Sequence, residues 1–189
     1  MDRREALSMV SLICGGTIIG ASGFLAGCTE NHQKSIMGLL DSSQQRLIED
    51  LAEIILPKSP KSPGAKDVEV GKFINSIVSD CYSELEQQAF LDGLIKLDEI
   101  SEQSFGKTYL KLSVADKNQL ILNLEKEAKR FNQSLQEGNP PHYYSLMKQL
   151  TIWGYLSSEM VGTKVMRFSP IPGRYEGCLP YEKGEKAFS

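Results

Sequence analysis

The chain has 189 residues, which is enough for one domain once a leader is removed. Hydrophobic residues make up 41% and charged residues 24%, and the formal net charge is −3, as in an ordinary globular protein. Nucleic-acid binding needs a clustered basic surface, so this charge excludes it from the expected functions. A domain of this size needs neither a metal nor a disulfide to fold.

The first 27 residues have the three parts of an export signal. Arg3 and Arg4 give a positive start, and an uncharged apolar stretch follows from Met9 to Leu25. The stretch ends in Leu25-Ala26-Gly27-Cys28. These four residues resemble a lipobox, the tetrapeptide at which bacterial lipoproteins are cleaved and their cysteine is lipidated. We therefore predict a signal peptide over residues 1–27 and a lipid on Cys28.

Two features of this leader leave alternatives open. Arg3 and Arg4 before a glycine-rich stretch also resemble a twin-arginine signal, which exports folded proteins, but Ala6 and Ser8 stand where that motif has phenylalanine and lysine. An uncleaved membrane anchor over residues 9–27 is the other alternative, because this span is just long enough to cross a bilayer. Both alternatives place the domain on the same side of the membrane.

The mature chain is predicted to consist of a polar tether over residues 29–41 and a helical domain over residues 42–189. A lipid on Cys28 would hold this domain on the periplasmic side of a bacterial membrane.

Helical periodicity dominates the mature chain, which predicts an all-α fold: a single bundle-like domain of about five helices. Proline and glycine punctuate it, and the loop Pro57–Ala65, with three prolines and one glycine, is expected to have a fixed, extended shape. Ser42 with Gln45 and Ser113 with Asp116 have the spacing of helix-capping pairs. The predicted helices cover about 42–56, 68–88, 88–101, 113–131 and 141–161.

The last predicted helix is the most aromatic part of the chain, and its apolar residues occupy more than one face. Such a helix is either central in the bundle or covered by a partner. The segment Phe168–Tyr181 follows, with three prolines and two glycines, and it is predicted to form an ordered loop that lies on the helices.

The cysteines predict a disulfide between this C-terminal loop and a helix. Cys14 lies in the leader and Cys28 is the lipidation site, so Cys81 and Cys178 remain as an even pair in an oxidising compartment. Cys81 falls on the apolar face of its helix, so we expect a disulfide that fastens the C-terminal loop to this helix. The alternative is two separate buried thiols.

No catalytic apparatus is visible. The chain has no nucleophile elbow, P-loop or dinucleotide fingerprint, and no metal-ligand spacing. Its two histidines are His32, in the tether, and His142, which is expected at the surface of a helix start. The sequence therefore predicts no catalytic residue and no metal site.

Several segments, in one order, are similar to one family: gluconate 2-dehydrogenase subunit 3, the small subunit of membrane-bound flavin-dependent sugar and sugar-acid dehydrogenases. The resemblance spans nearly the whole chain. The matching segments are the Arg-Arg leader, Leu51–Pro57, Pro63–Ala65 with Val70, Phe73-Ile74 with Asp80-Cys81, Phe90 with Gly93-Leu94, Leu150-Thr151 with Gly154-Tyr155 and Ser157–Glu159, and Pro170–Cys178.

The resemblance implies an accessory subunit that is not an enzyme on its own. Its partner would be a large flavoprotein of the glucose-methanol-choline (GMC) type that holds FAD, so this chain would bind no cofactor. A cytochrome c subunit would be a further partner. The small subunit would carry the export signal for a catalytic subunit that lacks a leader.

Aromatic side chains dominate protein interfaces, which suggests a partner-binding surface near the end of the aromatic helix and in the C-terminal loop. Core packing is the alternative for the tryptophan, and ordinary helix-end polarity is the alternative for the serine and glutamate. A second function also stays open: a free-standing envelope lipoprotein that binds a ligand or acts as a scaffold. The predicted surface consists of Trp153, Tyr155, Ser158, Glu159, Pro172, Gly173 and Tyr175.

Overall fold

The computed structural model describes residues 39–171, 173, 177–180 and 182–188. The chain divides into two compact units, Met1–Leu39 and Leu40–Ser189, and the second is described below. The predicted signal peptide and its boundaries therefore stay predictions. The predicted sites that lie outside the described residues are Arg3, Arg4, Cys28, Pro172 and Tyr175.

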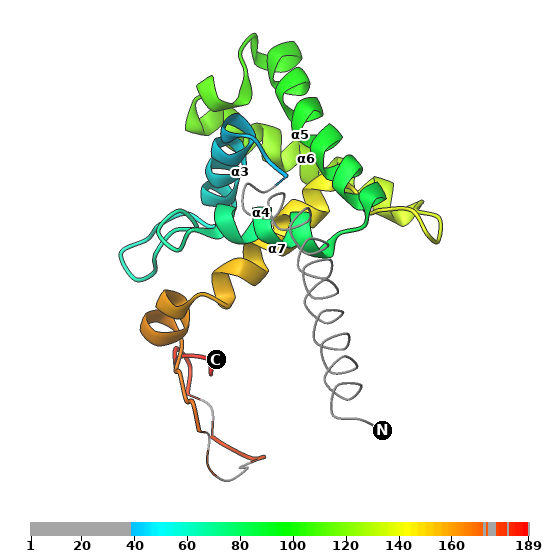
Figure 1. The fold of residues 1–189 in the computed structure, drawn as a ribbon. Helices are drawn as coiled ribbons and strands as arrows, with labels where there is room; N and C mark the ends of the chain where they lie inside the picture. Colours follow the sequence, from blue (N-terminus) through cyan, green and yellow to red (C-terminus); the bar gives the residue numbers. More distant parts are fainter. Residues whose placement is uncertain (1–38, 172, 174–176, 181, 189) are drawn as a thin grey trace, which may run out of the picture. The chain divides into compact units, whose positions relative to one another are not determined.

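The predicted all-α fold is confirmed, since the described residues form five α-helices and two short helical turns, and no β-strand (Figure 1). None of these helices is long and apolar enough to cross a membrane. The elements are α3 (Ser42–Ile55), α4 (Val70–Cys81), α5 (Glu84–Phe105), the 3-10 turn η1 (Tyr109–Lys111), α6 (Val114–Gln133), α7 (Tyr143–Leu156) and the π-helical turn η2 (Val161–Val165).

Helix starts follow local capping chemistry. α3 begins at Ser42 as predicted, but the capping pair is Asp41 and Gln44, because Asp41 Oδ1 accepts from the backbone N–H of Gln44 at 2.8 Å and Gln44 Oε1 accepts from that of Asp41 at 3.0 Å. The predicted cap of α6 is confirmed, since Ser113 Oγ accepts from the backbone N–H of Asp116 at 3.2 Å.

The predicted boundary near residue 88 is wrong, because the chain breaks earlier, between α4 and α5. Ser83 and Glu86 form a capping box that starts α5. Gln87 Nε2 donates to the carbonyls of Val78, Ser79 and Tyr82 within 3.2 Å, which satisfies the open end of α4.

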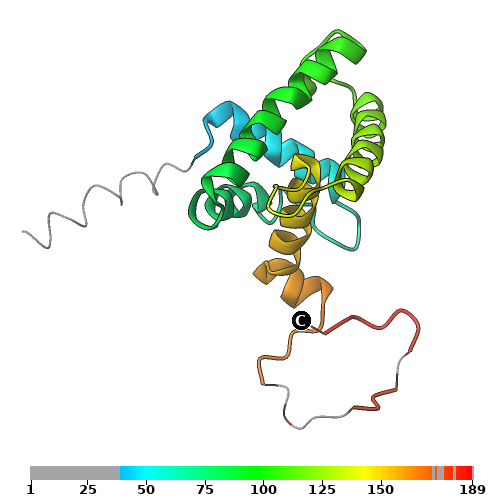
Figure 2. The ribbon, with the colours of Figure 1, turned by 90° about the vertical axis from the view of Figure 1, so that its right-hand side faces the viewer.

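α7 is the centre of the domain. It contacts α3, α4, α5 and α6, and it leads into η2 (Figures 1 and 2). A Cβ on Gly93 of α5 would lie 2.1 Å from Cγ of Tyr143, so only glycine permits this close approach of α5 to α7. Of the two alternatives for the aromatic helix, the structure shows the central one, with one edge left exposed. The buried side chains of α7 are Tyr143, Tyr144, Leu146, Met147, Leu150, Thr151 and Tyr155.

Candidate functional site

The exposed edge of α7 carries three apolar side chains, Ile152, Trp153 and Leu156, which we call the α7 strip. Their exposed fractions are 40%, 52% and 50%. Trp153 is held at one edge by Phe73 of α4, with ring centroids 5.2 Å apart and an interplanar angle of 84°. Core packing therefore does not account for Trp153, which presents half of its surface to solvent.

Tyr155 has the opposite orientation, because it is buried and its hydroxyl donates to the carbonyl of Pro63 at 2.9 Å. The predicted contact of Tyr155 with a partner stays a prediction, and in this structure the side chain contacts the loop of its own chain. Its neighbours Trp153 and Leu156 are exposed on the α7 strip, whereas Tyr155 is buried and its hydroxyl bonds to the loop Pro57–Ala65.

That loop, which we call the proline loop, is also held by a carboxylate of α3. Glu53 accepts from the backbone N–H of Lys58 at 3.0 Å and from that of Lys66 at 2.9 Å. A Cβ on Gly64 would lie 2.3 Å from Glu53 Oε1, so the glycine leaves room for the carboxylate. The proline loop is anchored, but the prediction that it is extended is wrong, because Ser59 and Ser62 pair across a tight turn. Its main anchor, Glu53, was not singled out from the sequence.

Asp67 closes the C-terminal end of the proline loop. Its Oδ2 accepts from the backbone N–H of Gly64 at 3.0 Å and lies 3.0 Å from Nζ of Lys58. The hydrogen bond from Gly64, and then that from Lys58, lowers the pKa of the Asp67 carboxyl. Asp67 is therefore a charged anchor between the two ends of the loop.

Ser158 and Glu159 lie where α7 gives way to η2. Ser158 Oγ donates to the carbonyl of Tyr155 at 2.7 Å, so the proton of this hydroxyl is already bonded within the same helical turn. The backbone N–H of Met166 donates to the carbonyl of Val161 at 2.9 Å, the spacing of a π-helix. Glu159 is exposed, and both it and Ser158 line a shallow hollow between η2 and the residues that follow the proline loop.

The predicted disulfide is absent, because Cys81 and Cys178 are both free and exposed. The core face of α4 is formed by Val70, Ile74 and Val78, and Cys81 is the last residue of the helix, beyond the packed region. Its predicted burial is therefore wrong, and the alternative of two buried thiols is wrong as well.

The C-terminal segment, residues 167–188, is held at its two ends instead. The backbone N–H of Arg167 donates to the carbonyl of Ala187 at 2.7 Å, and the guanidinium lies 4.5 Å from the ring centre of Phe188 and pairs with Glu185. Ile171 is 85% exposed. The described part of this segment therefore does not lie on the helices as predicted (Figure 2). Gly173 is exposed, and its φ of 74° is one that glycine adopts without strain.

His142 is buried, which corrects its predicted surface position. It caps α7, since Nδ1 accepts from the backbone N–H of Tyr144 at 3.2 Å, which leaves the proton of the neutral ring on Nε2. Nε2 lies 3.6 Å from Oε1 of Glu127, too far for a hydrogen bond. Burial lowers the pKa of His142, which the Glu127 carboxylate only partly offsets.

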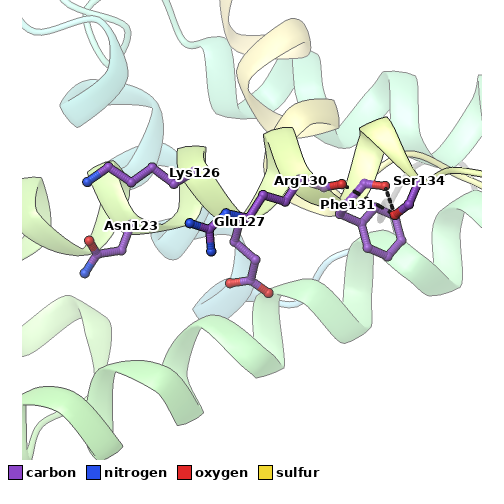
Figure 3. Close-up of a pocket in the computed structure, with 6 residues that line it drawn as sticks. All are labelled: Asn123, Lys126, Glu127, Arg130, Phe131 and Ser134. Carbon is purple, nitrogen blue, oxygen red and sulfur yellow. Dashed lines mark hydrogen bonds between the residues drawn. The ribbon is translucent and has the colours of Figure 1, made fainter.

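Glu127 belongs to a second hollow, on α6, where its side chain extends toward α5 (Figure 3). Burial raises its pKa, but the ion pair with Lys96 of α5 at 3.0 Å outweighs this and lowers it. The carboxylate is thus paired with Lys96, and His142 lies close to it without a hydrogen bond. Among the described residues no three His, Cys, Asp or Glu side chains lie together as a metal site. The lining residues are Asn123, Lys126, Glu127, Arg130, Phe131 and Ser134.

The candidate site therefore combines the α7 strip, the proline loop that Tyr155 and Glu53 hold, and η2. Searches among curated proteins and among solved structures found no match. A comparison with protein families matches residues 42–173, which include all five α-helices and the whole candidate site. The matched family is described as Gluconate 2-dehydrogenase subunit 3, and this chain belongs to it.

Proposed function

We propose that the chain is the non-catalytic small subunit of a periplasmic FAD-dependent dehydrogenase complex of the GMC type that oxidises a sugar or sugar acid. Its role is to aid export, assembly and membrane tethering of the catalytic subunit. Membership of the family implies a subunit of a dehydrogenase complex with partner subunits, which supports this proposal. FAD would be bound by the large subunit, a cytochrome c subunit would complete the complex, and Cys28 would provide the lipid anchor.

The observation that carries the proposal is the α7 strip. Trp153 is half exposed on the central helix, and Ile152 and Leu156 extend the apolar surface on either side of it. Because Phe73 packs against its ring, Trp153 loses little conformational freedom when a partner covers it. Rigid, partly exposed aromatic residues of this kind supply much of the binding energy of protein interfaces.

Mild-detergent purification of the tagged full chain from its native membrane tests the proposal. We expect a large polypeptide with flavin absorbance to co-purify. Trp153→Ala should weaken its retention by about 2 kcal/mol or more, which is roughly thirtyfold in Kd. Leu122→Ala is the matched control, because Leu122 of α6 is 53% exposed and lies outside the strip.

Two results would contradict the proposal in different ways. A colourless single chain would favour the free-standing lipoprotein. Equal retention in Trp153→Ala and Leu122→Ala, with flavin present, would leave the subunit role in place and show that the partner binds another surface.

A further inference from the structure

A third shallow hollow lies between the proline loop and η2, and its lining is basic although the chain as a whole is acidic. Three lysines and one aspartate line it, in a chain whose formal net charge is −3. The charged lining residues are Lys58, Lys61 and Lys164 against Asp67.

Ion pairing leaves two of these cations uncompensated. Lys58 pairs with Asp67 at 3.0 Å. Lys61 and Lys164 have no carboxylate partner within the described part of the chain, and they come from different segments, the proline loop and η2. The ammonium group of Lys186 is bound to the backbone of η2, because Lys186 Nζ donates to the carbonyl of Lys164 at 2.7 Å.

The hydroxyl groups of Ser59 and Ser62 also line the hollow and can supply a hydrogen-bond donor. Ser59 Oγ accepts from the backbone N–H groups of Lys61 at 3.3 Å and Ser62 at 3.1 Å, which occupies both of its lone pairs. Ser59 Oγ also lies 2.7 Å from Ser62 Oγ, and either hydroxyl can donate in this contact. When Ser59 donates in this contact, the Ser62 hydroxyl, which also lines the hollow, has its proton available for a ligand.

The backbone that carries these donors is fixed before any ligand arrives. Glu53 holds the amides at both ends of the proline loop, and Tyr155 holds the carbonyl of Pro63. Pro60 and Pro63 further restrict the chain on either side of Lys61 and Ser62. A preorganised set of donors loses little entropy on binding an anion.

We propose that this hollow binds a phosphate group, with Lys61, Lys164 and the Ser62 hydroxyl as its donors, and that the phosphate is that of an anionic lipid headgroup. The choice of a lipid depends on the predicted anchor at Cys28. The tether 29–41 has 13 residues, so it reaches about 45 Å at most and keeps the domain near the membrane surface. An inorganic phosphate has the same chemistry, and the experiment separates the two sources.

Residues 40–189 are suitable for the test, because the whole described hydrophobic core lies between Leu40 and Val161 and this part forms one compact unit. Circular dichroism would verify its folding. Co-sedimentation with phosphatidylcholine vesicles, with and without phosphatidylglycerol, measures lipid binding, and calorimetric titration with inorganic phosphate measures binding of the free anion.

Each lysine near an anionic surface changes vesicle binding about fivefold, so the double variant Lys61→Gln, Lys164→Gln should bind about twenty-five-fold more weakly. The control variant Lys107→Gln, Lys129→Gln removes the same charge from exposed positions on other elements and should bind nearly as wild type. Ser62→Ala leaves the charge unchanged and should weaken binding about three- to tenfold.

Selective binding to phosphatidylglycerol vesicles, lost in the Lys61 and Lys164 variant, would support the lipid site. Binding of inorganic phosphate alone, lost in the same variant, would support the phosphate site and overturn the lipid as its source. Absence of both kinds of binding, or an equal loss in the two double variants, would overturn the proposal.

Discussion

Two proline-containing segments of this domain are held in different ways. The proline loop is fastened along its length by Glu53, Asp67 and Tyr155. The C-terminal segment 167–188 is joined at its base, by the contacts of Arg167 with the residues near Phe188, and its described apolar side chains are exposed. Both segments are rich in proline, so composition does not distinguish them.

The difference shows what orders a loop in this domain. A loop whose backbone amides and carbonyls bond to side chains of the helices, as the proline loop does with Glu53 and Tyr155, is anchored to the folded core even where its residues are exposed. The described part of the C-terminal segment is closed by contacts between its own ends, bonds to η2 through Lys186 and the carbonyl of Lys164, and keeps its apolar side chains exposed. The connection before α7 is of the first kind, because Asn132 Oδ1 accepts from the backbone N–H of His142 at 3.0 Å and Asn132 Nδ2 donates to Ser145 Oγ at 2.8 Å.

Glu53→Ala should have the largest effect, because it leaves the amides of Lys58 and Lys66 without their acceptor. We expect the free energy of unfolding to fall by about 2 kcal/mol, the size of a charge-assisted hydrogen-bond loss. Chemical denaturation of residues 40–189 measures it. Glu99→Ala removes an exposed carboxylate of α5 as a control. Equal stability of the two variants would mean that Glu53 does not hold the loop.

Tyr155→Phe removes only the hydroxyl that donates to Pro63. The expected loss is about 1 kcal/mol in the free energy of unfolding. Tyr82→Phe is the matched control, since the Tyr82 hydroxyl has no hydrogen-bond partner among the described residues and its ring is half-buried. If Tyr155→Phe is as stable as Tyr82→Phe, the hydrogen bond to the proline loop contributes nothing.

His142 should make the connection before α7 sensitive to acid. Burial lowers its pKa in the folded state, so the unfolded chain binds more protons at acidic pH. Its stabilisation is therefore complete above the unfolded pKa of about 6.5 and is lost as the pH falls toward the lower folded pKa. We expect a decline in stability, smaller than the effects above, over this acidic window.

His142→Asn keeps a capping side chain for Tyr144 but removes the titrating ring. Denaturation curves recorded at several pH values should therefore be flatter in this variant between pH 6.5 and the folded pKa. The charged groups that face His142 are Glu127 and Lys96, and Glu127 titrates at lower pH. The same slope in both proteins would show that His142 does not contribute to it.

Arg167→Ala should have the smallest effect on global stability, within about 0.5 kcal/mol, because the contacts that it removes, with Glu185 and Phe188, lie within the C-terminal segment. Limited proteolysis of that segment should nevertheless become faster, because the base is opened. A loss of stability comparable with that of Glu53→Ala would contradict the view that, of the two loops, only the proline loop is anchored to the helical domain.

The helical core could be predicted because its signals are local. Apolar spacing and the Ser113 cap identified α6, and Pro57 marked the end of α3. The break at Ser83 was missed, since apolar periodicity continues across it and its signals are a capping box and the amide of Gln87. For the candidate site, the sequence identified the exposed Trp153 but not the anchor Glu53.

The errors at the site have one physical origin. Cys81 was assigned from apolar spacing and Tyr155 from residue type, but the surroundings of both depend on which turn of a helix meets a neighbour. Tyr155 meets the proline loop and is buried, whereas Cys81 lies past the packed part of α4 and is exposed. Contacts between residues 92 positions apart, such as that of Tyr155 with Pro63, leave no trace in local spacing.

Hydrogen–deuterium exchange of the full chain, alone in detergent and in the flavoprotein complex purified from its membrane, tests most directly whether a partner covers the α7 strip. We predict slower exchange in the complex for the C-terminal half of α7 around Trp153 and for the adjoining η2, with little change in α6 around Leu122. Unchanged exchange around Trp153, with protection confined to α6, would contradict the proposed interface.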